Sequence, residues 1–371
     1  MELNYEKGMV YEGNSSRILK CMKKAEAGER IVLAFLGGSI TQGSLASSRE
    51  KCYAYRTYEW WKENFPAAEF VYLNAGIGGT CSHLGAGRVR EEVLSQKPDF
   101  VIVEFSVNDP DDDLRFQETY EGVIRTILKS ETHPAVLLVH NVRYDDGGNA
   151  EEIHRPVGAH YGLPSVSMKP VLYEAVLSGL LENREITPDD LHPNDLGHEL
   201  VAKVIACFLE HCRRKVSEEC VTECDTLPEP LTKNAYETAV RYRNDVLRPT
   251  ENCAFSTDLS AQSGISDCFK KGWTAEKKGA KIVFSVKGSC IAVQYRKTVR
   301  RPAPVAELIL DGDREHPVVL DANFEENWGD CLFLQPVLEH GEDGIHRVEI
   351  EIVQTPEEPA EKFYLVSLIV A

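Results

Sequence analysis

The first half of the chain contains three long apolar runs that end in the same way, in glycine and small polar residues. These runs cover residues 31–39 (IVLAFLGGS), 70–79 (FVYLNAGIGG) and 99–109 (DFVIVEFSVND). Unbroken apolar runs of this length are typical of strands that are buried on both faces of a parallel sheet. A chain with this feature is expected to cover both faces of that sheet with helices.

The remaining segments of this half predict the helices and further apolar segments. Residues 135–142 (AVLLVHNV) predict a fourth strand, and a short apolar piece follows at residues 163–168. Helical patterns cover residues 14–27, 53–64, 82–96, 118–130, 151–161 and 194–213, with another helix from about residue 171. Strands that alternate with helices indicate that residues 1–215 form one α/β domain, a three-layer parallel-sheet (flavodoxin-like) fold.

The composition changes after this domain. Residues 216–248 are acidic and contain prolines, and we interpret them as a linker and docking segment. Short apolar segments then alternate with turn signals such as Asp311-Gly312. The expected strands are residues 281–286, 290–296, 305–310, 346–353 and 363–370. This pattern predicts that residues 249–371 form an antiparallel β-sandwich of the jelly-roll type.

The polar ends of the first three strands are where chemistry is expected, because ligands of parallel α/β sheets bind beyond the carboxyl ends of the strands. Two phosphate-binding motifs can be tested there. A Walker loop requires a lysine after its second glycine, but Gly43 is followed by Ser44 and Leu45. The dinucleotide fingerprint requires a third glycine, but Gly76-x-Gly78 continues to Cys81. Both nucleotide interpretations therefore lack a key residue.

Four short motifs occur instead in one order along the chain, each at a predicted strand end or helix start. They are Gly37-Gly38-Ser39 with Gly43, Asn74 with Gly79, Ser106-Val107-Asn108-Asp109, and Asp189-x-x-His192-Pro193. With these motifs residues 1–215 resemble the SGNH (GDSL-like) hydrolase family. Gly38 replaces the aspartate of the family's first motif, and Ser106 replaces the glycine of its third. Neither position supplies a catalytic group in the family, so only local turn geometry is affected.

The resemblance implies a serine esterase in which Ser39 is the nucleophile. A serine hydroxyl attacks effectively only when a base takes its proton, and His192 would do this and then protonate the leaving alcohol. Asp189 would orient the imidazole; Asp190 competes for this role, but the D-x-x-H spacing favours Asp189. The backbone N–H groups of Ser39 and Gly79 and the amide of Asn108 would form the oxyanion hole.

Each of these residues also has a purely structural interpretation. Serine commonly caps a helix after a strand, as Ser39 would. Asn108 lies just before a proline-containing turn, and His192-Pro193 is a plausible helix start. The joint occurrence of all four motifs favours the catalytic interpretation. The mechanism needs no cofactor and no metal.

Charge and cysteine content restrict the partners. A formal net charge of −18 disfavours nucleic acid and anionic membranes. No apolar run approaches the ~20 residues that span a bilayer, and the first residues lack a secretory signal, so a cytoplasmic location is expected. The eleven cysteines are expected to be reduced thiols. The densest group, His211, Cys212, Cys220 and Cys224, lacks a CxxC pair, which disfavours zinc.

The two-domain arrangement resembles carbohydrate esterases that remove O-acetyl groups, so the expected substrate is a small-molecule or oligosaccharide acyl ester. Trp328, in the polar loop at residues 323–330, is a candidate sugar contact. Packing between the domains and oligomer formation through the β-sandwich are alternatives. Two other functions stay open: a thioesterase, lysophospholipase or acyltransferase on the same triad, or a catalytically silent glycan-binding protein. The intact triad and Asn108 argue against the last.

Overall fold

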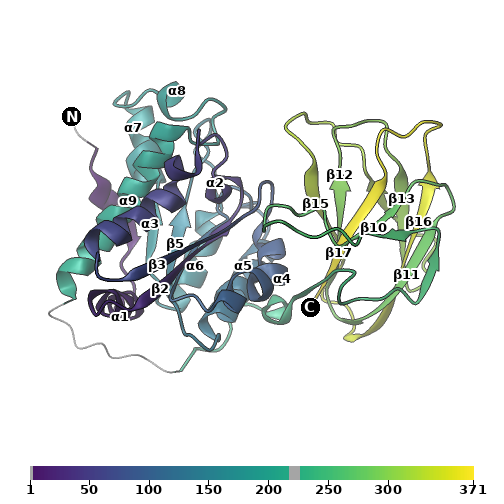
Figure 1. Cartoon of the computed structure of the whole chain (residues 1–371), viewed down its shortest axis with the longest axis horizontal. Coiled ribbons are helices and arrows are strands. Elements are labelled where there is room, and N and C mark those ends of the chain that lie inside the picture. Colours follow the sequence, from purple (N-terminus) through teal and green to yellow (C-terminus); the bar gives the residue numbers. More distant parts are fainter. Residues whose placement is uncertain (1–2, 217–225) are drawn as a thin grey trace. The chain divides into compact units, whose positions relative to one another are not determined.

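The computed structural model describes residues 3–216 and 226–371, which form two compact units, Met1–Asn234 and Ala235–Ala371 (Figure 1). Part of the predicted linker, with Cys220 and Cys224 of the cysteine-rich group, lies outside the described residues.

The first unit is built on a six-stranded sheet with the order β1-β6-β5-β4-β2-β3. Its strands are β1 (Met9–Tyr11), β2 (Arg30–Gly37), β3 (Glu69–Gly76), β4 (Phe100–Glu104), β5 (Ala135–His140) and β6 (Ser165–Ser167). All pairs are parallel except β1 with β6. Because β2 lies between β3 and β4, the segments that follow these two strands leave the sheet on opposite sides of the segment that follows β2.

Helices cover both faces of this sheet (Figure 1). One face carries α1 (Ser16–Glu26), α3 (Tyr53–Asn64) and α9 (Asp195–Lys215), whose apolar side chains share one core cluster with β2 and β4. The other face carries α4 (Ser82–Glu92), α5 (Arg115–Leu128) and α6 (Glu151–His160). Shorter elements are α2 (Ser39–Gln42), α7 (Glu174–Leu177), α8 (Asn183–Ile186), η1 (Tyr5–Gly8), η2 (Arg49–Lys51), η3 (Leu94–Gln96) and η4 (Lys169–Tyr173).

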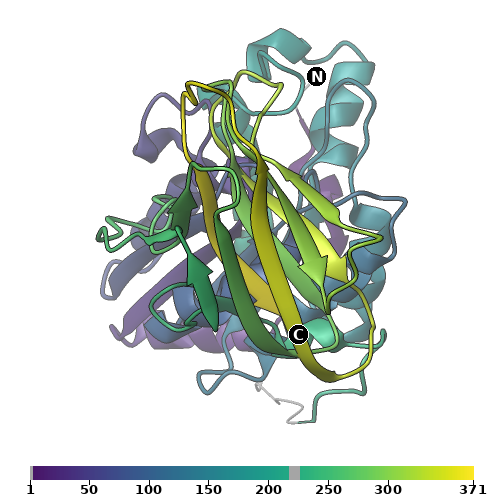
Figure 2. The ribbon, with the colours of Figure 1, turned by 90° about the vertical axis from the view of Figure 1, so that its right-hand side faces the viewer.

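The second unit consists of two antiparallel sheets, drawn in green and yellow in Figures 1 and 2. One has the order β15-β12-β17-β10-β9, with β7 also paired to β17, and the other has the order β14-β13-β16-β11-β8. After η5 (Ala235–Thr238), the strands are β7 (Val240–Tyr242), β8 (Glu251–Cys253), β9 (Ser256–Thr257), β10 (Trp273–Ala275), β11 (Lys281–Gly288), β12 (Ile291–Lys297), β13 (Val305–Leu310), β14 (Val318–Asp321), β15 (Cys331–Leu338), β16 (Gly344–Gln354) and β17 (Phe363–Val370).

The interior of the second unit holds an apolar cluster to which both sheets contribute, including Trp273, Phe284, Tyr295 and Phe363. The predicted fold class, a three-layer parallel-sheet domain followed by an antiparallel β-sandwich, is confirmed. Within the segment predicted as linker and docking segment, β7 adds a strand to the sandwich.

Candidate active site

Ser39 lies at the turn between β2 and α2, and the two residues before it, Gly37 and Gly38, are both glycines. A Cβ atom on Gly37 would lie 2.2 Å from the Thr41 hydroxyl and 2.4 Å from the Glu104 carbonyl oxygen, so only glycine fits this turn. Ser39 is the first residue of α2, and its side chain is largely buried. The tight turn thus holds the Ser39 hydroxyl at the carboxyl edge of the sheet.

His192 and Asp189 approach Ser39 from the loop between α8 and α9. The His192 Nε2 atom lies 2.8 Å from the Ser39 hydroxyl, although the two residues are 153 positions apart in the chain. The other ring nitrogen, Nδ1, lies 2.7 Å from the Asp189 carboxylate. The structure therefore brings the three residues together as a continuous hydrogen-bonded relay of carboxylate, imidazole and hydroxyl.

The loop that carries Asp189 also fixes this carboxylate. Its Oδ1 atom accepts the N–H of His192 at 2.7 Å and the N–H of Leu191 at 3.1 Å. Burial acts to raise the pKa of Asp189, but hydrogen bonds from the His192 ring and from these two N–H groups hold the pKa below its usual value. Asp189 is therefore a carboxylate at neutral pH, as a partner for an imidazolium must be.

Asp190, the competitor for this role, is engaged elsewhere. Its carboxylate accepts hydrogen bonds from Asn183 and, at 2.7 Å, from Arg184. Its backbone has a φ of 65°, and its carbonyl accepts the N–H of Tyr144 at 2.7 Å. These contacts attach the loop to α8 and to the segment after β5, so Asp190 does not face His192.

The three predicted oxyanion donors lie around the same turn. Gly79 has a φ of 67°, which suits glycine. Its neighbour Gly78 donates its N–H to Gln42 at 2.6 Å, whereas the N–H groups of Ser39 and Gly79 have no hydrogen-bond partner in the part of the chain that the structure describes. Both N–H groups are thus available to a substrate oxygen.

The carboxamide of Asn108 packs against Gly38. A Cβ atom at position 38 would lie 2.1 Å from Asn108 Oδ1, so the side chain of Asn108 fills the space that a larger residue would need. This carboxamide oxygen is buried and has no partner among the described residues. The departure of position 38 from the family pattern is therefore coupled to the position of Asn108, a predicted oxyanion donor, and the sequence alone did not reveal this link.

The second departure, Ser106, serves a buried carboxyl group. The N–H and hydroxyl of Ser106 donate to Glu104 at 3.0 and 2.8 Å. Burial raises the pKa of Glu104 to about 7, although these hydrogen bonds oppose the shift. A glycine here would remove the hydroxyl donor to this fully buried group.

Asn74, the first residue of the second motif, ties that motif to the nucleophile turn. Its amide donates to the Thr41 carbonyl oxygen at 2.7 Å, and its carbonyl oxygen accepts the N–H of Gly76 at 2.8 Å. Arg88 supports both turns from α4: it forms a buried ion pair with Glu92 at 2.7 Å and donates to the carbonyl groups of Ala75 and Gly37.

Two other candidates are not members of the hydrogen-bonded relay. Trp328, in the second unit, is 53% exposed and packs edge-on against Phe324 with ring centroids 5.1 Å apart. In the disfavoured zinc group, His211 contacts Glu12 at 3.2 Å. Within residues 3–216 and 226–371, no cluster of three or more histidine, cysteine or acidic side chains could hold a metal ion.

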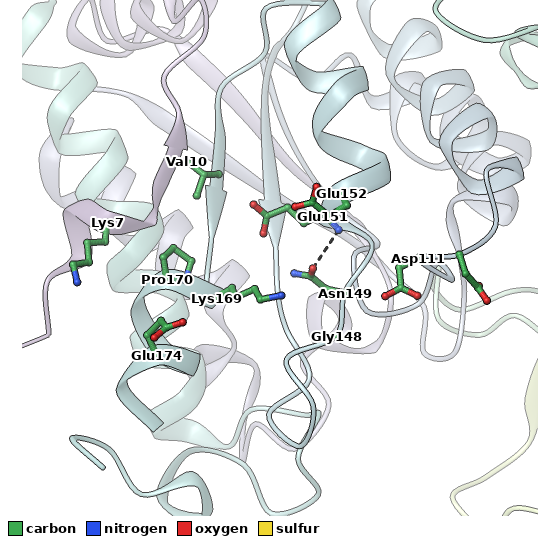
Figure 3. A pocket seen from close by; sticks show the side chains of 11 residues that line it. Lys7, Val10, Asp111, Gly148, Asn149, Glu151, Glu152, Lys169, Pro170 and Glu174 are labelled. Carbon is green, nitrogen blue, oxygen red and sulfur yellow. Dashed lines mark hydrogen bonds between the residues drawn. The ribbon is translucent and has the colours of Figure 1, made fainter. Parts of the chain in front are cut away.

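A cavity of about 890 Å³ opens beside the third motif (Figure 3). Its lining comes from η1 and β1 and from the segments that follow β4, β5 and β6, and it is mostly charged, with Asp111 on one side and Lys7 on the other in Figure 3. Ser39, Asp189 and His192 do not line it. The cavity therefore lies over the other half of the sheet edge, next to the triad strand β2 but not above it.

None of the described helices is both long and apolar enough to span a membrane.

Comparison with known proteins places these features in context. Residues 35–200 match the model of the GDSL-like lipase/acylhydrolase family. The crystal structure of a two-domain esterase active on acetylated mannans is similar over the whole chain, with 54% identity, a TM-score of 0.95, and coverage of 100% of this chain and 98% of that chain. Its structure co-crystallised with mannopentaose matches with the same values. No curated protein sequence matches the chain significantly.

Proposed function

The chain belongs to the GDSL-like lipase/acylhydrolase family and is an ester hydrolase, and we propose that it removes O-acetyl groups from mannan oligosaccharides. The observation that carries the hydrolase chemistry is the relay from Asp189 through His192 to Ser39, at 2.7 and 2.8 Å. The substrate class rests on the relative that acts on acetylated mannans, because the 54% identity extends over both units.

In the first half of the reaction, the Ser39 hydroxyl attacks the acetyl carbonyl carbon while His192 Nε2 takes its proton. Asp189 accepts from Nδ1 and stabilises the imidazolium that forms. The tetrahedral intermediate collapses when the bond to the sugar oxygen breaks, and His192 returns the proton to that oxygen. The products of this step are a free sugar hydroxyl and an acetyl-Ser39 ester.

In the second half, water replaces the sugar. His192 takes a proton from the water, whose oxygen attacks the acetyl group, and Ser39 leaves with that proton as acetate is released. Negative charge develops on the carbonyl oxygen in both halves. The N–H groups of Ser39 and Gly79 and the amide of Asn108 are the donors proposed for it, each contributing about 3 kcal/mol to the transition state.

The test compares wild type with Ser39→Ala on p-nitrophenyl acetate, butyrate and octanoate and on acetylated mannan oligosaccharides, in buffer that contains a chelator. We expect rapid release of acetate from the mannan oligosaccharides, a rate that falls with acyl length, and no activity in Ser39→Ala. Activity that persists in Ser39→Ala would refute the nucleophile. A faster rate on octanoate than on acetate would instead favour the lysophospholipase alternative.

A further inference from the structure

Asp109, the last residue of the third motif, has a buried carboxylate whose two oxygens reach two different elements. Its Oδ1 atom accepts the N–H of Ser82 at 2.8 Å, and its Oδ2 atom lies 2.9 Å from Nε2 of His154. Asp109 is only 4% exposed and His154 is fully buried. A carboxylate in such surroundings needs partners for both oxygens, and these two contacts supply them.

These contacts join the two loops that carry the proposed oxyanion donors. Ser82 begins α4, shortly after Gly79, and Asp109 directly follows Asn108. The loops themselves come from β3 and β4, which are separated by β2 and do not pair with each other. No backbone ladder therefore sets the distance between Gly79 and Asn108. The hydrogen bond from Ser82 to Asp109 links the two loops across the strand that carries Ser39.

His154 holds this link from α6. Its ring is stacked on Tyr120, with centroids 3.7 Å apart and planes inclined by 5°. Because a carboxylate only accepts hydrogen bonds, the ring must present an N–H from Nε2 to Asp109. Nδ1 is buried and has no partner among the described residues, so the ring has a single polar contact and it is the one with Asp109.

We propose that Asp109 is a positioning residue that fixes the spacing of Gly79 and Asn108, and that His154 holds the Asp109 carboxylate in place. This inference rests on the proposed function. Asp109 touches no reacting atom in the proposed mechanism, so its loss is expected to lower kcat and to leave KM nearly unchanged. Small displacements of a donor from its productive position reduce rates by about 10- to 100-fold.

Asp109→Asn tests the link at constant size. The new side chain can still accept from Ser82, but its neutral N–H₂ group can pair with His154 only if the ring moves its proton from Nε2 to the buried Nδ1, so the hydrogen bond to a charged carboxylate is lost. We expect kcat on p-nitrophenyl acetate to fall about 10- to 100-fold with KM within about twofold. Glu121→Gln is the matched control, because Glu121 is a buried carboxylate that holds the distant Leu231 and Thr232 N–H groups. Its kcat should equal that of wild type.

A double-mutant cycle with Asn108→Ala separates positioning from general damage to the fold. If Asp109 acts through the oxyanion donors, Asp109→Asn should reduce kcat much less in the Asn108→Ala background than in wild type. Fully multiplicative losses would overturn the proposal, as would a wild-type kcat in Asp109→Asn. Activity that survives Ser39→Ala in the same assay would overturn the proposed function as well.

His154 variants keep the test decisive if Asp109→Asn does not fold. His154→Gln retains an N–H donor and His154→Phe does not, and both retain bulk against Tyr120. Positioning through the hydrogen bond predicts that His154→Gln recovers most of the kcat that His154→Phe loses, at equal thermal stability. Equal kcat losses in the two variants would overturn the role of the hydrogen bond from His154 to Asp109.

Discussion

The interiors of the two units differ in where they place polar groups. In the first unit, buried polar and charged side chains gather at the carboxyl ends of β4 and β5 and on the helices beside them; they include Glu104, Asp109, His140, Asn141 and His154. In the second unit, the space between the two sheets is filled by aliphatic and aromatic side chains from both sheets. The interior of the second unit is therefore mainly apolar, whereas the first unit buries polar groups at one edge of its sheet.

Some of the described buried polar atoms at this edge of the sheet lack a hydrogen-bond partner, which lowers the stability of the fold. Both ring nitrogens of His140 and the hydroxyl of Tyr120 are buried without a partner in the described part of the chain. Each such group typically destabilises a fold by about 1–3 kcal/mol. Proteins tolerate such costs mainly at functional sites, where polar groups must be held in a fixed arrangement. This concentration of buried polar groups supports the proposal that the chemistry lies in the first unit.

The largest predicted loss of kcat concerns the loop that carries Asp189 and His192 in the first unit. Asp189→Asn should lower kcat about 10⁴-fold, because the orienting carboxylate is lost while the shape is kept. Asp190→Asn is the neighbouring control: it disrupts the contact with Arg184 and should lower the melting temperature, with kcat changed little. Steady-state kinetics on p-nitrophenyl acetate and thermal unfolding measure both. The reverse pattern would assign the orienting role to Asp190.

The second-largest predicted loss of kcat concerns the contact between Gly38 and Asn108. Asn108→Ala should lower kcat about 10²- to 10³-fold by removing one oxyanion donor. Gly38→Ala should act in the same direction, because the new methyl group would lie 2.1 Å from Asn108 Oδ1 and displace it. Gly264→Ala in the second unit is the matched control, since no atom lies within 4 Å of its Cβ position. Normal kcat in Gly38→Ala would show that Asn108 is not held by this contact.

The sequence was sufficient for the elements with strong local signals. The helix at residues 53–64 has the predicted bounds, and Asn194 caps α9 through hydrogen bonds to the Leu196 and Gly197 N–H groups. The Asp311-Gly312 turn has positive φ at both residues, as the pair predicts. Each of these features is encoded within a few neighbouring residues, so no knowledge of distant contacts was needed.

The strands missed by the sequence lack such local signals. β1 has three residues and joins the sheet through its main chain, which requires no side-chain pattern. β15 contains Pro336, which argues against a strand, but β15 is at the edge of its sheet, where proline is tolerated. Within residues 82–96, predicted as one helix, α4 ends at Glu92 and a 3₁₀ turn follows.

Within the candidate site, too, the residues that the sequence predicted are those with a local motif. The D-x-x-H spacing places Asp189 beside His192 because both lie on one short loop. His154, in contrast, carried no sequence signal that distinguished it from the other histidines, because 45 residues and the packing of α6 separate it from Asp109. The coupling of Gly38 to Asn108 is likewise a contact between two loops. Motifs reveal groups that are close in sequence, whereas the groups that support them are determined by the tertiary fold.

A third prediction contrasts two buried carboxyl groups, one in each unit. Burial raises the pKa of Glu104 from 4.5 to about 7, so the folded protein keeps a proton that the unfolded chain loses earlier. Stability from this group is therefore lost as pH rises from about 4.5 to about 7. Relative to wild type, Glu104→Gln should gain stability over this range, up to about 3 kcal/mol at pH 8.

Glu349 in the second unit should behave in the opposite way. Burial acts to raise the pKa of Glu349, but Arg347 and Arg314 hold that pKa below its usual value. Glu349→Gln should therefore lose stability at neutral pH, and the deficit should shrink as pH falls into the acid range. Urea unfolding of wild type and both variants between pH 4 and pH 8 measures these trends. A Glu104→Gln difference that does not vary with pH would contradict the prediction for the first unit.

The smallest predicted effect is a change in KM, and it concerns the contribution of the second unit to substrate binding. Trp328 stays a candidate sugar contact because its ring is half exposed and its edge-on contact with Phe324 fixes its orientation. Ring stacking of this kind contributes about 1 kcal/mol, so Trp328→Ala should raise KM for acetylated mannan oligosaccharides about three- to tenfold. Hydrolysis of p-nitrophenyl acetate, which has no sugar ring, should not change. Ile345→Ala, at another exposed apolar position of this unit, should alter neither value. If Trp328→Ala raised KM for both substrates equally, the second unit would act on the catalytic unit itself rather than on the sugar.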